Sequence, residues 1–158
     1  MDISIVPIEK GPGIECVIGQ GNFSIFTVDT LATTLKAAVP SLAFGVAMNE
    51  AKPRLVRVEG NDDDLCSSAA EACRAIGAGH VFVVMMKGAF PINVLNAVKG
   101  HPAVCRVYAA SENPLEALVG ETELGRSVIG VVDGTSVNAV EDNAQRKERK
   151  EILQMLGY

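Results

Sequence analysis

Apolar and polar residues alternate along the chain in a way that predicts short strands and amphipathic helices. Two β-branched runs, at 3–8 and 14–18, flank a Gly/Pro turn and predict a β-hairpin. Further strands are predicted at 42–48, 54–59, 81–86, 104–109, 115–119 and 127–132. The strand Val81–Met86 is apolar on both faces, so it should lie in the centre of a sheet.

Helical periodicity predicts three or four helices. They lie between a Thr27 cap and Pro40, between a cap at Asn61 or Asp62 and Gly77, at 91–99, and at 140–156. In the last of these, Asp142 and Arg146 have a spacing that favours an ion pair. We therefore expect one α/β domain over residues 1–158, with a mixed β-sheet and three to four helices packed on it.

The composition is that of a globular protein. Of 158 residues, 48% are hydrophobic and 21% are charged, a balance that excludes a disordered chain. The longest apolar run, Val81–Met86, is far too short to cross a membrane, so no membrane partner is expected. The first residues, MDISIVPIEK, lack the basic and apolar regions of a signal peptide, and we expect a cytoplasmic protein.

The charge distribution narrows the choice of partners. The net charge is −5, and the one dense basic tract, RKERK at 146–150, is flanked by acidic residues. Aromatic residues make up 4% and Trp is absent, so neither a basic stripe nor a stacking platform for a nucleic acid polymer is present. Small molecules and other protein chains remain. The apolar composition of so short a chain predicts a homo-oligomer.

Common nucleotide and hydrolase motifs are absent. The chain has no Walker loop, no G-x-G-x-x-G fingerprint and no G-x-S-x-G elbow. The four cysteines form no C-x-x-C pair, and because all occupy apolar stretches we expect them to be reduced core residues.

Of the two histidines, His80 is the stronger candidate for chemistry. It follows Gly77-Ala78-Gly79 and precedes the predicted central strand, where small residues let a ligand approach the backbone. A neutral imidazole can act there as a nucleophile or base. The alternative is a partly buried histidine bonded to a carbonyl. His101, between Gly100 and Pro102, is expected to be an exposed loop residue.

Several polar residues could serve a ligand beside His80. The carboxylates of Glu121 and Glu123 could share a face and hold Mg²⁺, and Glu50 closes an apolar strand; each could equally be an ordinary solvated residue. Arg57 and Arg126 could clamp a phosphate or form structural salt bridges. The amides of Asn93 and Asn96 share a helix face and could read a purine edge or ribose hydroxyls.

Four long strings carry a family resemblance. They are RLVRVEGND (54–62), IGAGHVFVV (76–84), AFPINVLNAVKGHPAVCRVY (89–108) and ETELGRSVIGVVDG (121–134). These strings closely resemble the adenosine-specific kinase family of small archaeal and bacterial proteins. The resemblance runs from Leu42 to the C-terminus and is weaker before it.

The resemblance implies binding of adenosine or AMP and a histidine that carries a phosphoryl group, a role that falls to His80. It also implies a trimer or a multiple of one. We assign substrate binding to Glu50, Arg57, Asn61, Asn93, Asn96 and Arg126, and a possible Mg²⁺ ion to Glu121 and Glu123. Three hypotheses follow: a phosphotransferase acting through His80, a binding protein that senses adenosine or AMP without turnover, and a structural oligomer with a vestigial pocket.

Overall fold

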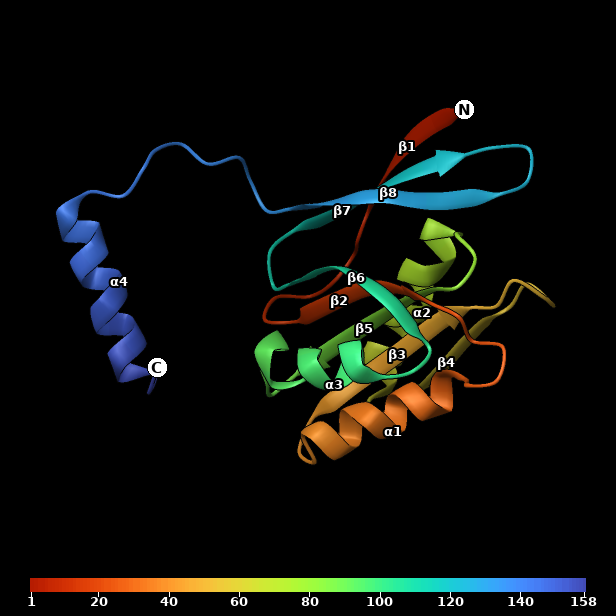
Figure 1. Ribbon diagram of the computed structural model, residues 1–158, viewed down its shortest axis with the longest axis horizontal. Coiled ribbons are helices and arrows are strands. Elements are labelled where there is room, and N and C mark those ends of the chain that lie inside the picture. The colour runs from red at the N-terminus through yellow and green to blue at the C-terminus, as the bar shows by residue number, and fades with distance from the viewer.

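The computed structural model describes all residues, 1–158, as two antiparallel sheets and four α-helices (Figure 1). The strands are β1 Asp2–Pro7, β2 Glu15–Gly21, β3 Ala43–Asn49, β4 Val56–Gly60, β5 Val81–Lys87, β6 Val104–Ser111, β7 Leu115–Glu121 and β8 Arg126–Asp133. The helices are α1 Val28–Ala38, α2 Asp63–Ile76, α3 Leu95–Gly100 and α4 Asn143–Met155, with a 3₁₀ turn η1 at Pro91–Asn93. The expected α/β class is confirmed.

The strands form one sheet in the order β4-β3-β5-β2-β6 and another in the order β1-β7-β8. The predicted hairpin between the first two strands is therefore wrong. β1 pairs with β7, and Ile8 beyond it still donates a backbone hydrogen bond to Leu115. β2 pairs instead with β5 and β6. Two adjacent β-patterns around a turn show that strands follow one another, but do not decide which strand each one pairs with.

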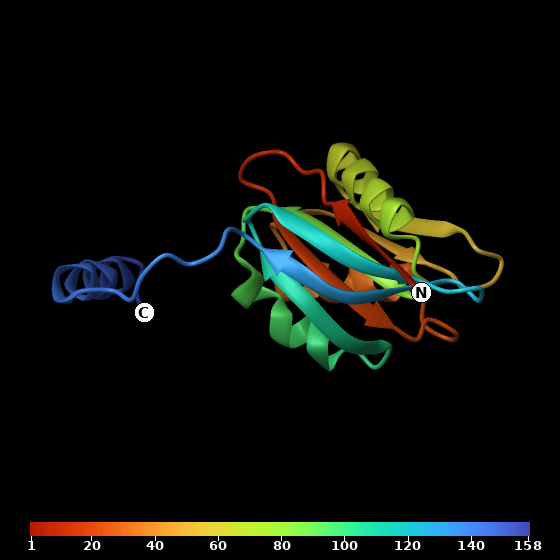
Figure 2. The same ribbon diagram turned by 90° about the horizontal axis from the view of Figure 1, so that it is seen from above.

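The five-stranded sheet is covered on both faces (Figure 2). On one face, a core cluster joins its side chains to α2 and to the inner face of the three-stranded sheet. On the other face, a second cluster joins them to α1 and α3. β5 lies at the centre, and Val81–Met86 are all buried, as the apolar run predicts.

Helix α2 is anchored at its start by a cap and a close contact. The side chain of Asp62 accepts a hydrogen bond from the Leu65 amide at 3.0 Å, which satisfies a free N–H of the first turn. Gly45 of β3 lies directly beneath, and a β-carbon there would come 2.3 Å from the Cys66 backbone nitrogen. Only glycine allows this approach of helix to strand. At its other end, α2 stops at Gly77, which is left-handed with φ 66°.

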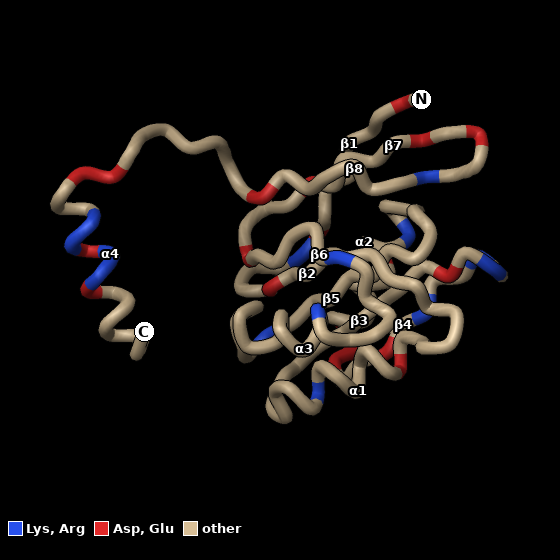
Figure 3. The backbone as a smooth tube through the Cα atoms, in the orientation of Figure 1, with Lys and Arg blue, Asp and Glu red and all other residues tan.

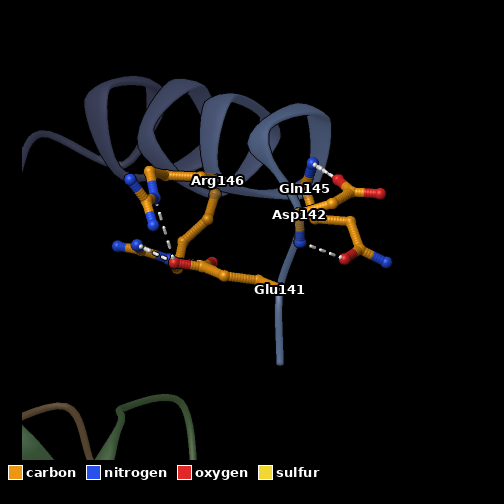
Figure 4. A network of polar contacts seen from close by, with 5 residues as sticks. Glu141, Asp142, Gln145 and Arg146 are labelled. Atoms are coloured by element: carbon orange, nitrogen blue, oxygen red, sulfur yellow. Dashed lines mark hydrogen bonds and ion pairs between the residues drawn. The ribbon is translucent and has the colours of Figure 1, made fainter. Parts of the chain in front are cut away.

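The predicted helix at 91–99 is divided into η1 and α3, and the last helix begins at Asn143 rather than residue 140. This last helix carries a cluster of Lys and Arg and stands away from the rest of the molecule (Figure 3). Asp142 does not pair with Arg146 as expected. It caps the helix by accepting from the Gln145 amide, while Glu141 pairs with Arg146 and Arg149 (Figure 4). The cap takes the Asp142 carboxylate out of reach of an ion pair.

None of the helices is both long and apolar enough to span a membrane. All four cysteines are free thiols, but only two fit the expected core placement. Cys16 and Cys73 are buried, Cys66 is half-buried on α2, and Cys105 is exposed on the edge strand β6. An edge strand has one side open to solvent, and this explains the exposure of Cys105.

Candidate functional site

Most of the predicted site residues lie at one end of the strands of the five-stranded sheet, which we call the His80 edge. At this end β2 and β3 finish and β4, β5 and β6 begin, as the register pairs Gly21 with Val104 and Asn49 with Val56. His80 precedes β5 at this edge. Its φ of 59° is left-handed, a conformation that costs a residue with a side chain about 1–2 kcal/mol. Strain of this kind clusters at functional sites.

The backbone of His80 is held on both sides. Its N–H donates to the Asn49 carbonyl at 2.9 Å, and its own carbonyl accepts from the Gly21 N–H at 2.9 Å. These two bonds tie the strained residue to the ends of β3 and β2. The imidazole ring is partly exposed and meets the ring of Phe23 edge-on, with centroids 6.5 Å apart. The contact with Phe23 therefore orients the His80 ring, and part of the residue is still exposed to solvent.

Asn49 organises the turn that presents His80. Its side chain is 7% exposed, and its Nδ2 donates to the carbonyls of Cys73 at 2.8 Å and Ala78 at 2.9 Å. It thus connects the end of β3 to the last turn of α2 and to the Gly-rich loop. Its Oδ1 is buried without a hydrogen-bond partner. A buried acceptor without a donor marks a place where a ligand or water donor belongs.

Glu50 and Arg57 form an ion pair at the same edge. The Nε of Arg57 lies 2.9 Å from the Oε2 of Glu50, with both side chains partly exposed. That oxygen is buried, and its 2.9 Å contact with Arg57 lacks hydrogen-bond geometry, so it can accept a further hydrogen bond only from a donor that displaces the atoms covering it. The pair joins the start of β4 to the residue after Asn49.

Arg126 holds the end of α2. Its Nη1 donates to the carbonyls of Ala75 at 3.1 Å and Ile76 at 3.2 Å, while its Nε lies 3.4 Å from the Glu121 carboxylate. A β-carbon on Gly77 would lie 3.1 Å from this guanidinium. A cation at the C-terminal end of a helix complements the helix dipole. Arg126 thus lies against the loop that carries His80; its Nη1 makes the hydrogen bonds to α2, and its Nε faces Glu121 without hydrogen-bond geometry.

The two carboxylates predicted to hold a metal lie at the β7–β8 turn. Glu121 faces Arg126, and Glu123 is exposed. No group of three or more His, Cys, Asp or Glu side chains is placed to bind a metal ion. These residues do not form a metal site by themselves. A Mg²⁺ ion here would need water or a substrate phosphate for its other ligands, so its binding remains a prediction.

Three predicted binding residues lie elsewhere. The carboxamide of Asn61 bonds to the backbone of Phe44 and Leu42, at the opposite end of β3 from Asn49 and about 20 Å away at strand spacing. Asn93 accepts from the Phe90 amide, beyond the far end of β5, and Asn96 is exposed on α3. The structure does not bring these amides to His80.

His101 differs from the expected exposed loop residue. It is 7% exposed, its Nε2 lies 3.1 Å from the Thr30 hydroxyl, and its Nδ1 accepts from the Ala103 amide at 3.1 Å. Burial lowers the pKa of this ring, since desolvation disfavours the charged form. The turn between Gly100 and Pro102 is covered by α1, a long-range contact that local sequence does not reveal.

Sequence reasoning missed Asn49 and Phe23. Asn49 is a polar residue that ends an apolar strand, and this position is a sequence signal for a site residue. The sequence analysis assigns substrate binding to the adjacent Glu50 instead. Phe23 had no local signal, because its contact with His80 depends on the pairing of β2 with β5.

Comparisons with known proteins identify relatives of the whole chain. The family model for adenosine specific kinase matches residues 6–158. The crystal structure of the PH1918 protein from Pyrococcus horikoshii OT3 superposes with a TM-score of 0.96 at 58% sequence identity, covering 99% of this chain and 97% of that one. No curated protein matches the chain. The match over nearly all of its length places the chain in the adenosine-specific kinase family.

Proposed function

We propose that this protein binds adenosine or AMP at the His80 edge of the five-stranded sheet and moves a phosphoryl group through the His80 ring. The observation that carries the proposal is the backbone of His80, left-handed and fixed between Asn49 and Gly21. A strained histidine, oriented by Phe23 and partly open to solvent, is poised for nucleophilic work rather than for packing.

The neighbouring acceptors suit a nucleoside. Asn49 Oδ1 and Glu50 Oε2 lack hydrogen-bond partners, and they belong to consecutive residues at the end of β3. Ribose hydroxyls are donors, so these buried oxygens accept from the sugar only if the side chains that cover them move aside, while the partly exposed imidazole lies edge-on to the buried ring of Phe23. Arg57 forms an ion pair with Glu50, and because its side chain is 47% exposed, its guanidinium can also bind a phosphate.

The proposed transfer has two steps and uses a phosphoanhydride as donor. A ring nitrogen of His80 attacks the terminal phosphorus, so that an N–P bond forms and the P–O bond to the leaving phosphate breaks. The 5′-hydroxyl of adenosine then attacks that phosphorus. An O–P bond forms, the N–P bond breaks, and the hydroxyl proton passes to solvent as the ring returns to its neutral form. The product is AMP.

The experiment follows a labelled phosphate. The protein is incubated with ATP labelled in its terminal phosphate, and then with adenosine. We expect an acid-labile, base-stable label on the protein that adenosine discharges as AMP. His80→Asn should take up no label while still binding adenosine by calorimetry, and His101→Asn, which alters the only other histidine, should label normally. Uptake of label by His80→Asn would refute the mechanism. Repeating the assay with a chelator tests the Mg²⁺ predicted at Glu121 and Glu123.

A second candidate is a protein that senses adenosine or AMP without transfer. The arrangement of the arginines favours it, because Arg126 is engaged with α2 and Glu121, and Arg57 is paired with Glu50. A site whose two arginines are both held by protein contacts suits a nucleoside better than a triphosphate. Under this alternative, calorimetry gives adenosine binding in the wild type and the labelled-phosphate assay gives no uptake.

A further inference from the structure

The last 25 residues of the chain do not pack against either hydrophobic core. The C-terminal arm, residues 134–158, consists of an extended segment followed by α4, and it projects from the end of β8 (Figures 1 and 2). No residue of the arm belongs to either core cluster, and none of α4 is buried. Apolar side chains of its last turns face solvent: Ile152, Leu153, Met155, Leu156 and Tyr158.

A helix in this position needs a partner. An isolated helix of 13 residues is marginal in water, and most helical stability in proteins comes from packing of an apolar face. The cap formed by Asp142 and Gln145 and the ion pairs of Glu141 stabilise only the first turns (Figure 4). The apolar residues lie at the other end, where nothing in the chain covers them.

The position of the arm is shared with a solved relative. The Pyrococcus protein superposes over 99% of this chain with a TM-score of 0.96. Because the arm makes up about a sixth of the residues, such a score requires the arm to extend in the same direction in both chains. Two chains that differ at 42% of aligned positions keep the arm away from their own cores. Its partner is therefore outside the chain.

A second apolar surface is also uncovered. Side chains on the outward side of the three-stranded sheet form what we call the outer sheet face: Met1, Ile3, Ile5, Leu118, Ile129 and Val132. Ile3 and Ile5 are 63% and 62% exposed, although they lie in the middle of β1. Atoms of Ile129 and Met1 both lie within 4 Å of the position that a β-carbon on Gly120 would take, so these two side chains are neighbours on this face. A contiguous apolar patch of this kind marks an interaction surface.

The two surfaces are complementary in charge. Helix α4 has four basic and two acidic residues, a net charge of +2, which Glu141 and Asp142 before it bring to zero for the whole arm, whereas residues 1–133 have 10 basic and 15 acidic residues, a net charge of −5. The three-stranded sheet with its turn contributes five of those acids and only Arg126 as a base (Figure 3). A basic helix with an apolar tip fits an acidic sheet with an apolar centre.

We propose that the arm of one copy packs the apolar tip of α4 onto the outer sheet face of a second copy. The nine residues at 134–142 can span up to about 30 Å, enough to reach a neighbouring molecule. Each chain offers one arm and one receiving face, so the contacts are satisfied either by two copies that exchange arms about a two-fold axis or by a closed ring of copies. This inference does not depend on the chemistry proposed for His80.

The test uses full-length variants and light scattering at micromolar concentration. The wild type should be a closed oligomer. Ile152→Glu with Leu156→Glu on the arm, and Ile3→Glu with Ile5→Glu on the sheet, should each weaken association about a hundredfold, as central apolar contacts do. Gln154→Glu on the opposite side of α4, combined with Leu124→Glu in the β7–β8 turn, adds the same two negative charges elsewhere and should leave the mass unchanged. Near-UV circular dichroism checks that each variant is folded.

Mixing the two double variants identifies the contact. One supplies an intact arm and the other an intact sheet face, so the mixture should recover association, seen as mixed species by native mass spectrometry. A monomeric wild type overturns the proposal, as does a sheet variant that keeps its mass while the arm variant dissociates, because α4 would then pack on something else. A mixture that stays monomeric overturns it as well.

Discussion

Asn49 offers a direct test of how the candidate site is built. Asn49→Ala removes two hydrogen bonds, to the carbonyls of Cys73 and Ala78. The Cys73 carbonyl keeps a bond from the Gly77 N–H at 2.9 Å, so its loss is near the usual net value of about 1 kcal/mol. The Ala78 carbonyl keeps only a 3.5 Å contact with the Val81 N–H, and leaving it nearly unpaired costs about 1–2 kcal/mol.

The sum is a loss of about 2–3 kcal/mol in the free energy of unfolding, or about 4–12 °C in melting temperature for a domain of this size. The turn carrying His80 should also loosen, so phosphate incorporation should fall more than tenfold. Leu35→Ala is the matched control, since it opens a cavity in the core on the other face, at a cost of about 2–5 kcal/mol. It should melt low but label normally below its transition.

The assay is thermal unfolding together with labelling of His80, both measured well below the transition of each variant. Asn49→Ala that melts within about 1 °C of the wild type would show that the two bonds carry no net stability. Loss of labelling to the same extent in Leu35→Ala would show that the site responds to stability in general rather than to Asn49.

Other predictions follow from the same geometry. His80→Gly and His80→Asn should melt near the wild type and His80→Val lower, because a β-branched residue is strained at φ 59°; equal melting temperatures would refute the strain. The pKa of buried His101 is lowered, so the unfolded chain binds more protons and stability should fall as the pH drops below about 6.5. His101→Asn should flatten this dependence of melting temperature on pH. Equal slopes in the variant and the wild type would show that His101 is not its cause. Burial raises the pKa of Cys16 to about 12 and also raises that of Cys73, so a thiol reagent at pH 8 should modify exposed Cys105 first. A fast phase of thiol modification that persists in Cys105→Ser would contradict this.

Local pattern predicted the elements that depend on local physics. The central position of β5 follows from Val81–Met86 being apolar on both faces, and the end of α2 follows from Gly77. The pairing of β1 with β7 does not follow, because more than 100 residues separate the two strands and no local feature marks the partner. The arm shows the same limit: the periodicity at its end indicates a helix, but not that the helix lacks a partner in its own chain.

For the candidate site, too, local sequence indicates some residues correctly placed for a site and others that serve only the fold. His80 is singled out because Gly77 and Gly79 precede it, and Glu50 and Arg57 form an ion pair next to Asn49, whose carbonyl accepts from the His80 N–H. Asn61 has the residue type of a ligand contact, but its carboxamide supports the start of β3. An Asn that binds a ligand and an Asn that satisfies backbone groups look alike in sequence, since the same donor and acceptor serve either purpose.

The anchoring of α2 has a kinetic consequence. The helix rests on Gly45 at one end, while Asn49 and Arg126 hold its other end, so the turn before His80 cannot move without displacing the helix. The hydrogen-bonded amides of this turn, Gly77 and His80, should therefore exchange with deuterium only when the helix is displaced, more slowly than exposed Gly79. If a nucleoside binds at His80 as proposed, it meets a backbone that is already in place, and we expect diffusion and desolvation rather than a conformational change to set the rate of association.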